Sequence, residues 1–91
     1  NLLDAEAASR LLLRPVNSRV AIRPEAIQIA AQGIEGRILG HSLLGNVIRY
    51  RIEARGVELT VDVLNRSAAD LHAAGQAVNL TIDNHAIREV A

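Results

Sequence analysis

The side chains that could perform catalysis or bind a metal ion are few and widely spaced. His41, His72 and His85 show neither the His-x-His nor the His-x-x-x-His spacing that places two imidazoles on one side of a strand or helix. The chain has no cysteine, which excludes a thiol nucleophile, a disulfide framework and a cysteine-based zinc site. We therefore expect surface or partly satisfied histidines and predict no metal site.

Carboxylates and arginines alternate along one segment, where they indicate a solvated face. Arg49, Arg51 and Arg55 could form a basic stripe, but Glu53, Glu58 and Asp62 interleave with them and cancel most of the local field. The chain has ten basic and ten acidic residues and a single aromatic residue, Tyr50. Single-stranded nucleic acids need aromatic stacking platforms and excess positive charge, so no nucleic-acid partner is expected.

Two short polar segments are candidates for binding a ligand or a partner. Leu44-Gly45-Asn46 is typical of a turn that needs a positive φ. Its backbone N–H groups could also form an anion-binding nest, for which His41, Ser42 and Asn46 are the nearest side chains. The lack of lysine and of paired Ser/Thr residues makes the plain turn the better interpretation. Arg23-Pro24-Glu25 is interpreted first as a strand end, since proline fixes φ.

Period-two alternation of apolar residues predicts the strands that must position these groups. Apolar residues alternate with charged ones from Val47 to Val63, with a break at Arg55-Gly56, which predicts a β-hairpin. Cross-strand pairs of Arg and acidic residues are expected on its outer face. Shorter strands are predicted near 20–23, 27–29, 34–44 and 78–82. Gly36 and Gly40 suggest a bulge or bend in the third of these.

Helical signals are limited to two segments. Ser67 to Ala74 could form a short helix capped by Ser67 and ended by Gly75, although an ordered loop fits equally well. Residues 1–18 suit a helix by propensity and also suit two strands, Leu2 to Ala8 and Arg10 to Pro15. Arg14-Pro15 closes the segment as an extended dipeptide, which favours the strands.

These elements predict an all-β fold, a small OB-type barrel of about five to six short strands with at most one short helical turn. Glycine-marked bends and a length of 91 residues both suit that architecture. The apolar runs are far shorter than the roughly 20 residues that cross a bilayer, and the chain does not open with a signal segment. We therefore expect a cytoplasmic domain that does not insert into a membrane.

Three stretches of the chain, read in order, form a recognisable pattern. They are Val20 to Ile29, which contains Ile-Arg-Pro-Glu, then Leu43 to Ile52, with its Leu-Gly-Asn turn, and finally Leu71 to Ile82, where Gly75-Gln76 precedes a strand. Together they resemble the TOBE (transport-associated OB) domain of ABC-importer ATP-binding subunits. The resemblance covers roughly 19–91. Residues 1–18, which open with Asn1-Leu2-Leu3, resemble the strands that connect such a domain to the preceding ATPase region.

The resemblance implies a regulatory and subunit-contact domain without catalytic residues of its own. ATP and Mg²⁺ would belong to an upstream ATPase domain, because this chain has no Gly-x-x-x-x-Gly-Lys-Ser/Thr loop and no lysine to build one. The implied partners are that ATPase domain and a second copy of the subunit, with the membrane subunits contacted indirectly. The expected motif and contact residues are Arg23, Pro24, Glu25, Leu44, Gly45, Asn46 and Gly75. The implied importers carry iron, polyamine, sugar, sulfate or phosphonate.

Overall fold

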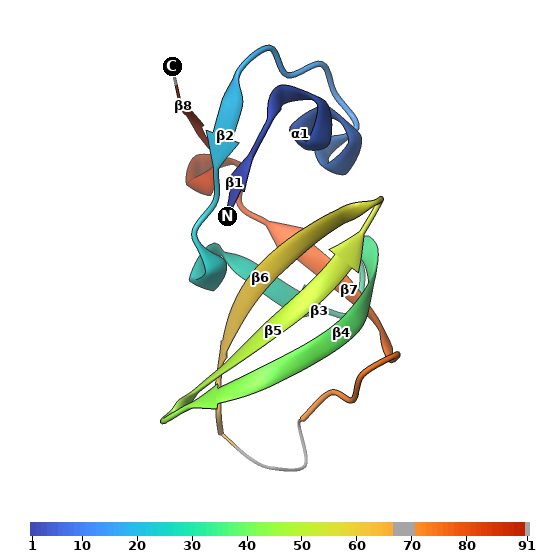
Figure 1. Ribbon diagram of the computed structural model, residues 1–91, viewed down its shortest axis with the longest axis vertical. Coiled ribbons are helices and arrows are strands. Elements are labelled where there is room, and N and C mark those ends of the chain that lie inside the picture. Colours follow the sequence, from blue (N-terminus) through green and yellow to red (C-terminus); the bar gives the residue numbers. More distant parts are fainter. Residues whose placement is uncertain (67–70, 91) are drawn as a thin grey trace.

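The computed structural model describes residues 1–66 and 71–90, which form two antiparallel β-sheets (Figure 1). The larger sheet has five strands in the spatial order β3-β7-β4-β5-β6. Its strands are β3 (Ile27–Ala30), β4 (Ile34–Leu44), β5 (Val47–Ala54), β6 (Val57–Leu64) and β7 (Ala77–Ile82). Each pair of neighbours is antiparallel, so β3, β4 and β6 run in one direction and β5 and β7 in the other.

The predicted hairpin is confirmed as β5 and β6. Its apolar positions point into the core, because Tyr50 lies opposite Val61 and Ile52 lies opposite Leu59, and all four side chains are buried. The charged positions between them face outward, as period-two alternation requires. The hydrophobic pattern alone therefore predicts which face of this hairpin is buried and which face is exposed.

The two hairpin turns differ in their backbone conformation. Between β5 and β6, Arg55 and Gly56 both have positive φ, 52° and 77°, as in a type I′ turn. Between β4 and β5, Gly45 has a φ of 66° and Asn46 has a negative φ, which fits a type II′ turn. The prediction of a positive φ in Leu44-Gly45-Asn46 is confirmed at its glycine.

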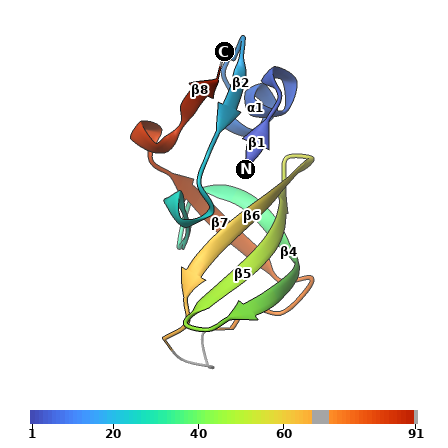
Figure 2. The same ribbon diagram turned by 60° about the vertical axis from the view of Figure 1, so that its left-hand side comes forward.

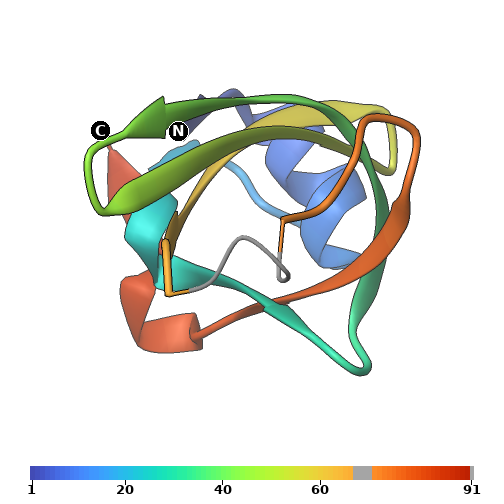
Figure 3. The same ribbon diagram turned by 90° about the horizontal axis from the view of Figure 1, so that it is seen from below.

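The larger sheet curls toward a barrel, as the view along its end shows (Figure 3). A bulge between Ile38 and Gly40 shifts the register of β4 and bends it, as expected from the glycines of this strand. Gly36 lies against β5, where an added Cβ would stand 2.9 Å from a side-chain carbon of Ile52. In the described part of the chain no strand pairing joins β3 to β6, although these two edge strands lie close together, with Cα atoms within 8 Å of one another; we call the boundary between them the seam.

A second, smaller sheet lies beyond one end of the barrel (Figures 1 and 2). It consists of β1 (Leu2–Leu3), β2 (Arg19–Ala21) and β8 (Arg88–Val90), in the order β1-β2-β8. Strand β2 had been expected from the alternation near Val20, whereas β8 is too short to produce a periodic signal. The small sheet joins the two ends of the described chain.

The interpretation of residues 1–18 as two strands is wrong for most of the segment. Only Leu2–Leu3 is extended, and Ala5–Leu12 forms helix α1. The Asp4 carboxylate caps the helix by accepting a hydrogen bond from the Ala7 N–H at 2.8 Å, and Ala8 and Leu11 are fully buried. Leu13 ends the helix in the left-handed region, at a φ of 52°. Pro15 thus follows the helix, a common position for proline, and is no sign of strand.

Two 3₁₀ turns complete the fold, η1 (Pro24–Ala26) and η3 (Asn84–Ala86). The possible helix at 67–74 lies partly outside the described residues, since 67–70 are not described. Of the remainder, 71–73 are irregular, and Ala74-Gly75 forms a turn before β7.

The predicted fold class is confirmed: the chain is mostly strand, in a small β domain consistent with an OB-type barrel. The main sheet has the expected number of strands, and the small sheet is an addition to the prediction. The core is aliphatic around the one tyrosine, and none of its members in the described chain is a charged residue. Within that part of the chain, no helix has the length and apolar character needed to cross a membrane.

Candidate functional site

A surface groove of about 800 Å³ lies along the unpaired seam between β3 and β6. Its lining includes apolar residues from both strands, Ile27 and Ile29 of β3 and Val63 and Leu64 of β6. Charged and polar side chains also line it. The residues that line it are Glu25, Ile27, Gln28, Ile29, Val47, Asp62, Val63, Leu64, Arg66 and His72.

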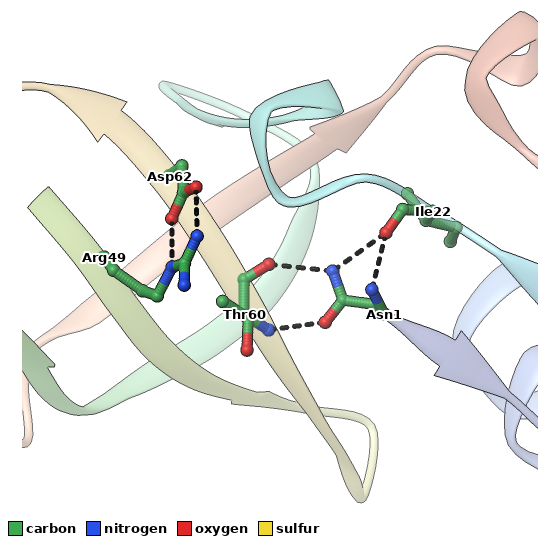
Figure 4. A network of polar contacts seen from close by, with 5 residues as sticks. All are labelled: Asn1, Ile22, Arg49, Thr60 and Asp62. Carbon is green, nitrogen blue, oxygen red and sulfur yellow. Dashed lines mark hydrogen bonds and ion pairs between the residues drawn. The ribbon is translucent and has the colours of Figure 1, made fainter. Parts of the chain in front are cut away.

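The backbone of β6 presents hydrogen-bonding groups to this seam. In the β5–β6 ladder the odd-numbered residues of β6 bond to β5, a series that continues where the Asn65 N–H donates to the Asn46 carbonyl. The even-numbered residues therefore turn their N–H and C=O groups away from β5. At Thr60 both groups are satisfied by the Asn1 side chain, which accepts from the Thr60 N–H at 2.6 Å and donates to its carbonyl at 2.8 Å (Figure 4).

Asn1 also continues the small sheet. Its backbone exchanges two hydrogen bonds with Ile22, at 2.9 and 2.8 Å, which extends the β1–β2 register by one pair. A second bond from its amide nitrogen reaches the Ile22 carbonyl at 3.1 Å. Asn1 thus connects the edge of the small sheet to the edge strand of the barrel (Figure 4).

An ion pair stands beside the seam on the outer face of the hairpin. Arg49 and Asp62 lie directly opposite each other and form two hydrogen bonds of 2.9 Å (Figure 4). The hydrogen bond from Arg49 lowers the pKa of the Asp62 carboxyl below its usual value, with the arginine charge adding to the effect. Asp62 raises the pKa of Arg49 in turn, and the charge of Glu25 adds to that rise. The expectation of cross-strand pairs is confirmed here and at Arg51–Glu58, 3.9 Å apart.

The Arg23-Pro24-Glu25 corner lies at one end of the same groove. Pro24 occupies the first position of η1, which ends the extended run and packs against β6. Glu25 lines the groove. Among residues 1–66 and 71–90, neither Arg23 nor Glu25 forms an ion pair, so the corner presents its charges to its surroundings.

Tyr50 is fully buried and lies between two of the three histidines. Its ring centroid stands 6.0 Å from that of His41 and 5.7 Å from that of His72. The tyrosine oxygen accepts a hydrogen bond from the His72 backbone N–H at 3.0 Å. The amide group of Gln76 holds the segment further, by bonding the His72 Nδ1 at 2.9 Å and the Ala73 N–H at 3.1 Å. The tyrosine thereby fixes residues 72–76 over the barrel end.

The structure separates the side chains considered for an anion-binding nest. His41 pairs with Tyr50 across the β4–β5 ladder and shares its face, whereas Ser42 pairs with Arg49 on the opposite face. Asn46 lies in the turn beyond, with its carbonyl accepting from Asn65 at 2.7 Å. Gly75, at a φ of 87°, donates its N–H to the Ile38 carbonyl at 2.7 Å and accepts from Arg37 at 2.9 Å.

Sequence reasoning missed two features of this surface. The alternation from Val47 to Val63 places Tyr50 among the apolar positions of the predicted hairpin, but nothing in the spacing of His41 and His72 shows that their rings lie near it, since three separate segments meet there. Asn1 was noted only as part of an opening tripeptide. Its role depends on a contact with Thr60, 59 residues away, for which the sequence carries no local signal.

The groove is lined by apolar, polar and charged side chains. A search for clusters of three or more possible metal ligands finds none in the residues that the structure describes. Among the lining residues, Glu25 and Asp62 are acidic and Arg66 is basic, and they lie beside the apolar side chains of β3 and β6.

Comparison with known proteins identifies the family. The family model described as the TOBE domain matches residues 20–88, about three quarters of the chain. No curated protein and no solved structure matches significantly. The matched region begins within β2 and ends within β8, so it contains the whole barrel and the groove. The chain belongs to the TOBE domain family.

Proposed function

We propose that this domain regulates the ATP-binding subunit of an ABC importer and supports contacts between its subunits. TOBE domains are non-catalytic and occur in ABC-transporter ATP-binding subunits, so the family match over 20–88 carries the proposal. In this proposal ATP and Mg²⁺ bind to an ATPase domain preceding this one in the same subunit. The domain would lie at the cytoplasmic face of the membrane through the transporter complex, and its cargo would be iron, polyamine, sugar, sulfate or phosphonate.

The groove and its corner support the contact role. Glu25 lines the groove beside apolar side chains, and Arg23, two residues before it, is exposed; this arrangement suits a partner that is held by both charged and apolar contacts. The proposed partners are the ATPase domain of the same subunit and a second copy of the subunit. The alternative of an oxyanion-sensing domain receives no support from the positions of His41 and Ser42, which face opposite sides of the sheet.

The first test is to measure ATP binding and hydrolysis by the 91-residue chain. We expect no binding heat on titration with Mg-ATP and no phosphate release, because the phosphate-binding loop would be in another domain. Measurable turnover would overturn the proposal. Titration with molybdate, sulfate, phosphate and iron(III) in the same cell should also be flat, and a saturable response would favour the ligand-sensing alternative.

The second test uses the full-length subunit. A variant that lacks the barrel region, residues 20–88, should still hydrolyse ATP at the basal rate. In this variant the rate of ATP hydrolysis should no longer depend on the association of two subunits. Loss of all hydrolysis in a folded deletion variant would show instead that the domain is part of the catalytic unit.

A further inference from the structure

The outer edge of the small sheet is unpaired at β8. Strand β8 is bonded to β2 on one side, and in the described chain no strand pairs with its other side. Two views place β8 at the outer margin of the sheet, with no other strand beyond it (Figures 1 and 2). The opposite margin differs, because there Asn1 connects β1 to Thr60 of the barrel. The free edge of β8 is therefore where this sheet could gain a fourth strand.

The hydrogen bonds of β2 show which of its backbone groups face β8. Asn1 and Ile22 exchange two hydrogen bonds, so Ile22 turns its N–H and C=O groups toward β1. Successive residues of a strand turn these groups to opposite sides, so those of Ala21 point toward β8. Ala21 lies opposite Arg88 in the register, and these two residues therefore use their backbone groups on each other.

Glu89 is the β8 residue whose backbone faces the free edge. Arg88 and Val90, on either side of it, turn their N–H and C=O groups toward β2, so those of Glu89 point away from β2. In the described chain neither of these two Glu89 groups has a hydrogen-bond partner. A strand beside β8 would bond to both of them through one residue placed directly opposite Glu89.

Arginine side chains gather on the solvent-exposed face of the small sheet. The register places Leu2, Ala21 and Arg88 in one row, and Arg19 lies two residues from Ala21 on the same face. Leu2 is 61% exposed and both arginines are exposed. Among residues 1–66 and 71–90 neither arginine forms an ion pair, and Asp4, which follows β1, uses its carboxylate to cap α1. This face therefore has an excess of positive charge and favours an acidic neighbour for Arg88.

The opposite face of the sheet has a pocket of about 640 Å³ beside Glu89. Glu89 and Val20 lie opposite each other in the register and both line it, which places the pocket on this face. Its other lining residues are Arg14, Val16, Asn84 and Ile87. The charges of Arg14 and Glu89 are opposite, and the remaining lining is mainly apolar. A partner residue opposite Glu89 would point to this side of the sheet, where an uncharged β-branched side chain fits best.

The charges of β8 disfavour a second copy of this chain at the free edge. A symmetric dimer through two β8 strands would pair them about a twofold axis. Because only the Glu89 groups of β8 point outward, that axis would place either Glu89 opposite Glu89 or Arg88 opposite Arg88. Like charges directly opposite each other destabilise an antiparallel pair. The edge is therefore better matched by a different segment, with an acidic residue opposite Arg88.

From these observations we propose that β8 binds an extended segment of a partner protein as a fourth, antiparallel strand of the small sheet. The segment would have an uncharged β-branched residue opposite Glu89 and an acidic residue opposite Arg88. The Glu89 backbone would supply two hydrogen bonds and fix the register, and Arg88 would select the acidic side chain. This surface is apart from the groove, and the inference goes beyond the proposed function.

The test is a titration of the ¹⁵N-labelled 91-residue chain with a capped Thr-Val-Thr-Glu-Val peptide, followed by NMR. Its central threonine would lie opposite Glu89 and its glutamate opposite Arg88. We expect saturable shifts that are largest at the Glu89 amide, which gains an acceptor. A peptide with lysine in place of the glutamate should bind about threefold to tenfold more weakly. Equal binding of both peptides, or shifts confined to other faces, would overturn the proposal.

Methylation of single peptide amides separates strand addition from simple charge attraction. The central threonine would donate its N–H to the Glu89 carbonyl, so a methyl group on that nitrogen should abolish binding. The N–H of the peptide glutamate would point away from β8, so methylation there is the matched control and should leave binding intact. Loss of binding with both methylated peptides, or with neither, would contradict the proposal.

Variants of β8 give an independent measurement. Arg88→Gln should weaken binding of the glutamate peptide and remove the preference over the lysine peptide. Arg51→Gln, an exposed position on the outer face of β5, is the matched control and should change neither. Glu89→Pro removes an N–H that β2 does not use, so it should leave the amide spectrum of the barrel unchanged and abolish binding. Unchanged binding in Arg88→Gln or Glu89→Pro would refute strand addition at this edge.

Two other occupants are outcomes of the same experiments. Dimerisation of the chain at NMR concentrations, abolished by Glu89→Pro, would assign the edge to a second copy and overturn the proposal. Binding to vesicles of phosphatidylcholine and phosphatidylserine that persists in Glu89→Pro and is lost in Arg88→Gln would assign the arginine face to a membrane, and would overturn it as well. ATP turnover by a chain that binds the peptide would overturn the proposed function alone.

Discussion

Tyr50 holds one end of the barrel together through its buried ring and its hydroxyl group. It contributes the largest fully buried side chain of the core, yet its hydroxyl oxygen reaches the backbone N–H of His72. An aromatic ring with a polar tip can do both, since it buries apolar area and still accepts a hydrogen bond. The segment that carries His72 and Gln76 is thereby attached to the core through one atom.

Removing that atom tests its role. Tyr50→Phe should lower the free energy of unfolding by about 1 kcal/mol, because the part-buried His72 N–H loses its acceptor while the ring still fills the core. Urea unfolding gives the stability, and hydrogen exchange should accelerate at the His72 amide. The Gly75 amide, which donates to Ile38, is the internal control. Unchanged exchange at His72 would show that Tyr50 does not hold the segment.

The Arg49–Asp62 pair predicts a specific pH dependence. The pKa of Asp62 is lowered in the folded state, so the pair stabilises the fold above the unfolded carboxyl pKa of about 3.9. That contribution is lost as the pH falls through the lower folded pKa. Asp62→Asn should therefore be less stable than the native chain at neutral pH, and the difference should shrink below about pH 4.

Urea unfolding of both proteins between pH 7 and pH 2.5 measures this difference. Glu58→Gln is the control, because Glu58 lies 3.9 Å from Arg51 and both side chains are more than half exposed. It should change stability little at any pH. A deficit of Asp62→Asn that persists at pH 2.5 would contradict the assigned role.

At the scale of elements, the hairpins are held by turn residues whose φ values are compatible with the strand twist. Arg55 is unusual in this respect, since it is not glycine and still has a φ of 52°. Its guanidinium donates a hydrogen bond to the Leu11 carbonyl at the end of α1. The turn therefore connects the barrel to the helix, and cations at helix C-termini are favourable.

Gly56 tests how much this turn contributes. Gly56→Ala should destabilise the domain by about 1–2 kcal/mol, since an L-residue is strained at a φ of 77° even though the added Cβ would have space. Gly40→Ala is the matched control: its backbone has no positive φ, and its Cβ would meet only the mobile end of Arg51 at 3.3 Å. Thermal unfolding of both variants makes the comparison. Equal losses would mean that turn conformation is not the cause.

At the scale of the whole molecule, two sheets are joined through few polar contacts. The small sheet and α1 lie at one end of the barrel (Figure 2), and Asn1 bonds both Ile22 and Thr60. Leu3, Leu11 and Val20 also belong to the same buried cluster as the barrel residues. The two sheets therefore share one continuous core. Asn1 adds a polar contact, because it hydrogen-bonds both the edge of the small sheet and the edge strand of the barrel.

This arrangement predicts a cost for removing the Asn1 amide. Asn1→Ala should lower the free energy of unfolding by about 1–2 kcal/mol, because it leaves the Thr60 N–H and C=O without their partners. Asn17→Ala, at an exposed position, is the control and should be neutral within about 0.5 kcal/mol. Hydrogen exchange at Thr60 should accelerate only in the first variant. Protection of Thr60 that survives Asn1→Ala would contradict the contact.

Much of the barrel could be predicted from local pattern, because a strand with one buried face must alternate with period two. The register of Val47 to Val63 and the bulge near Gly40 belong to this class. Helix α1 was not decided in this way, because the alanines and leucines of this segment favour a helix by propensity whereas Arg14-Pro15 was interpreted as the end of a strand. The Asp4 cap and the burial of Ala8 and Leu11 against the small sheet resolved it.

By itself, the sequence determined the fold class, the family resemblance, the inward and outward faces of the hairpin and the kinds of site that the chain cannot build. Those properties depend on composition and on contacts between near neighbours. Only the tertiary structure decided that Asn1 meets Thr60, that His41 and His72 flank Tyr50 and that β3 and β6 leave a seam. Each of these joins segments that are distant in sequence, and such contacts form only when the sheet curls and brings its edges together.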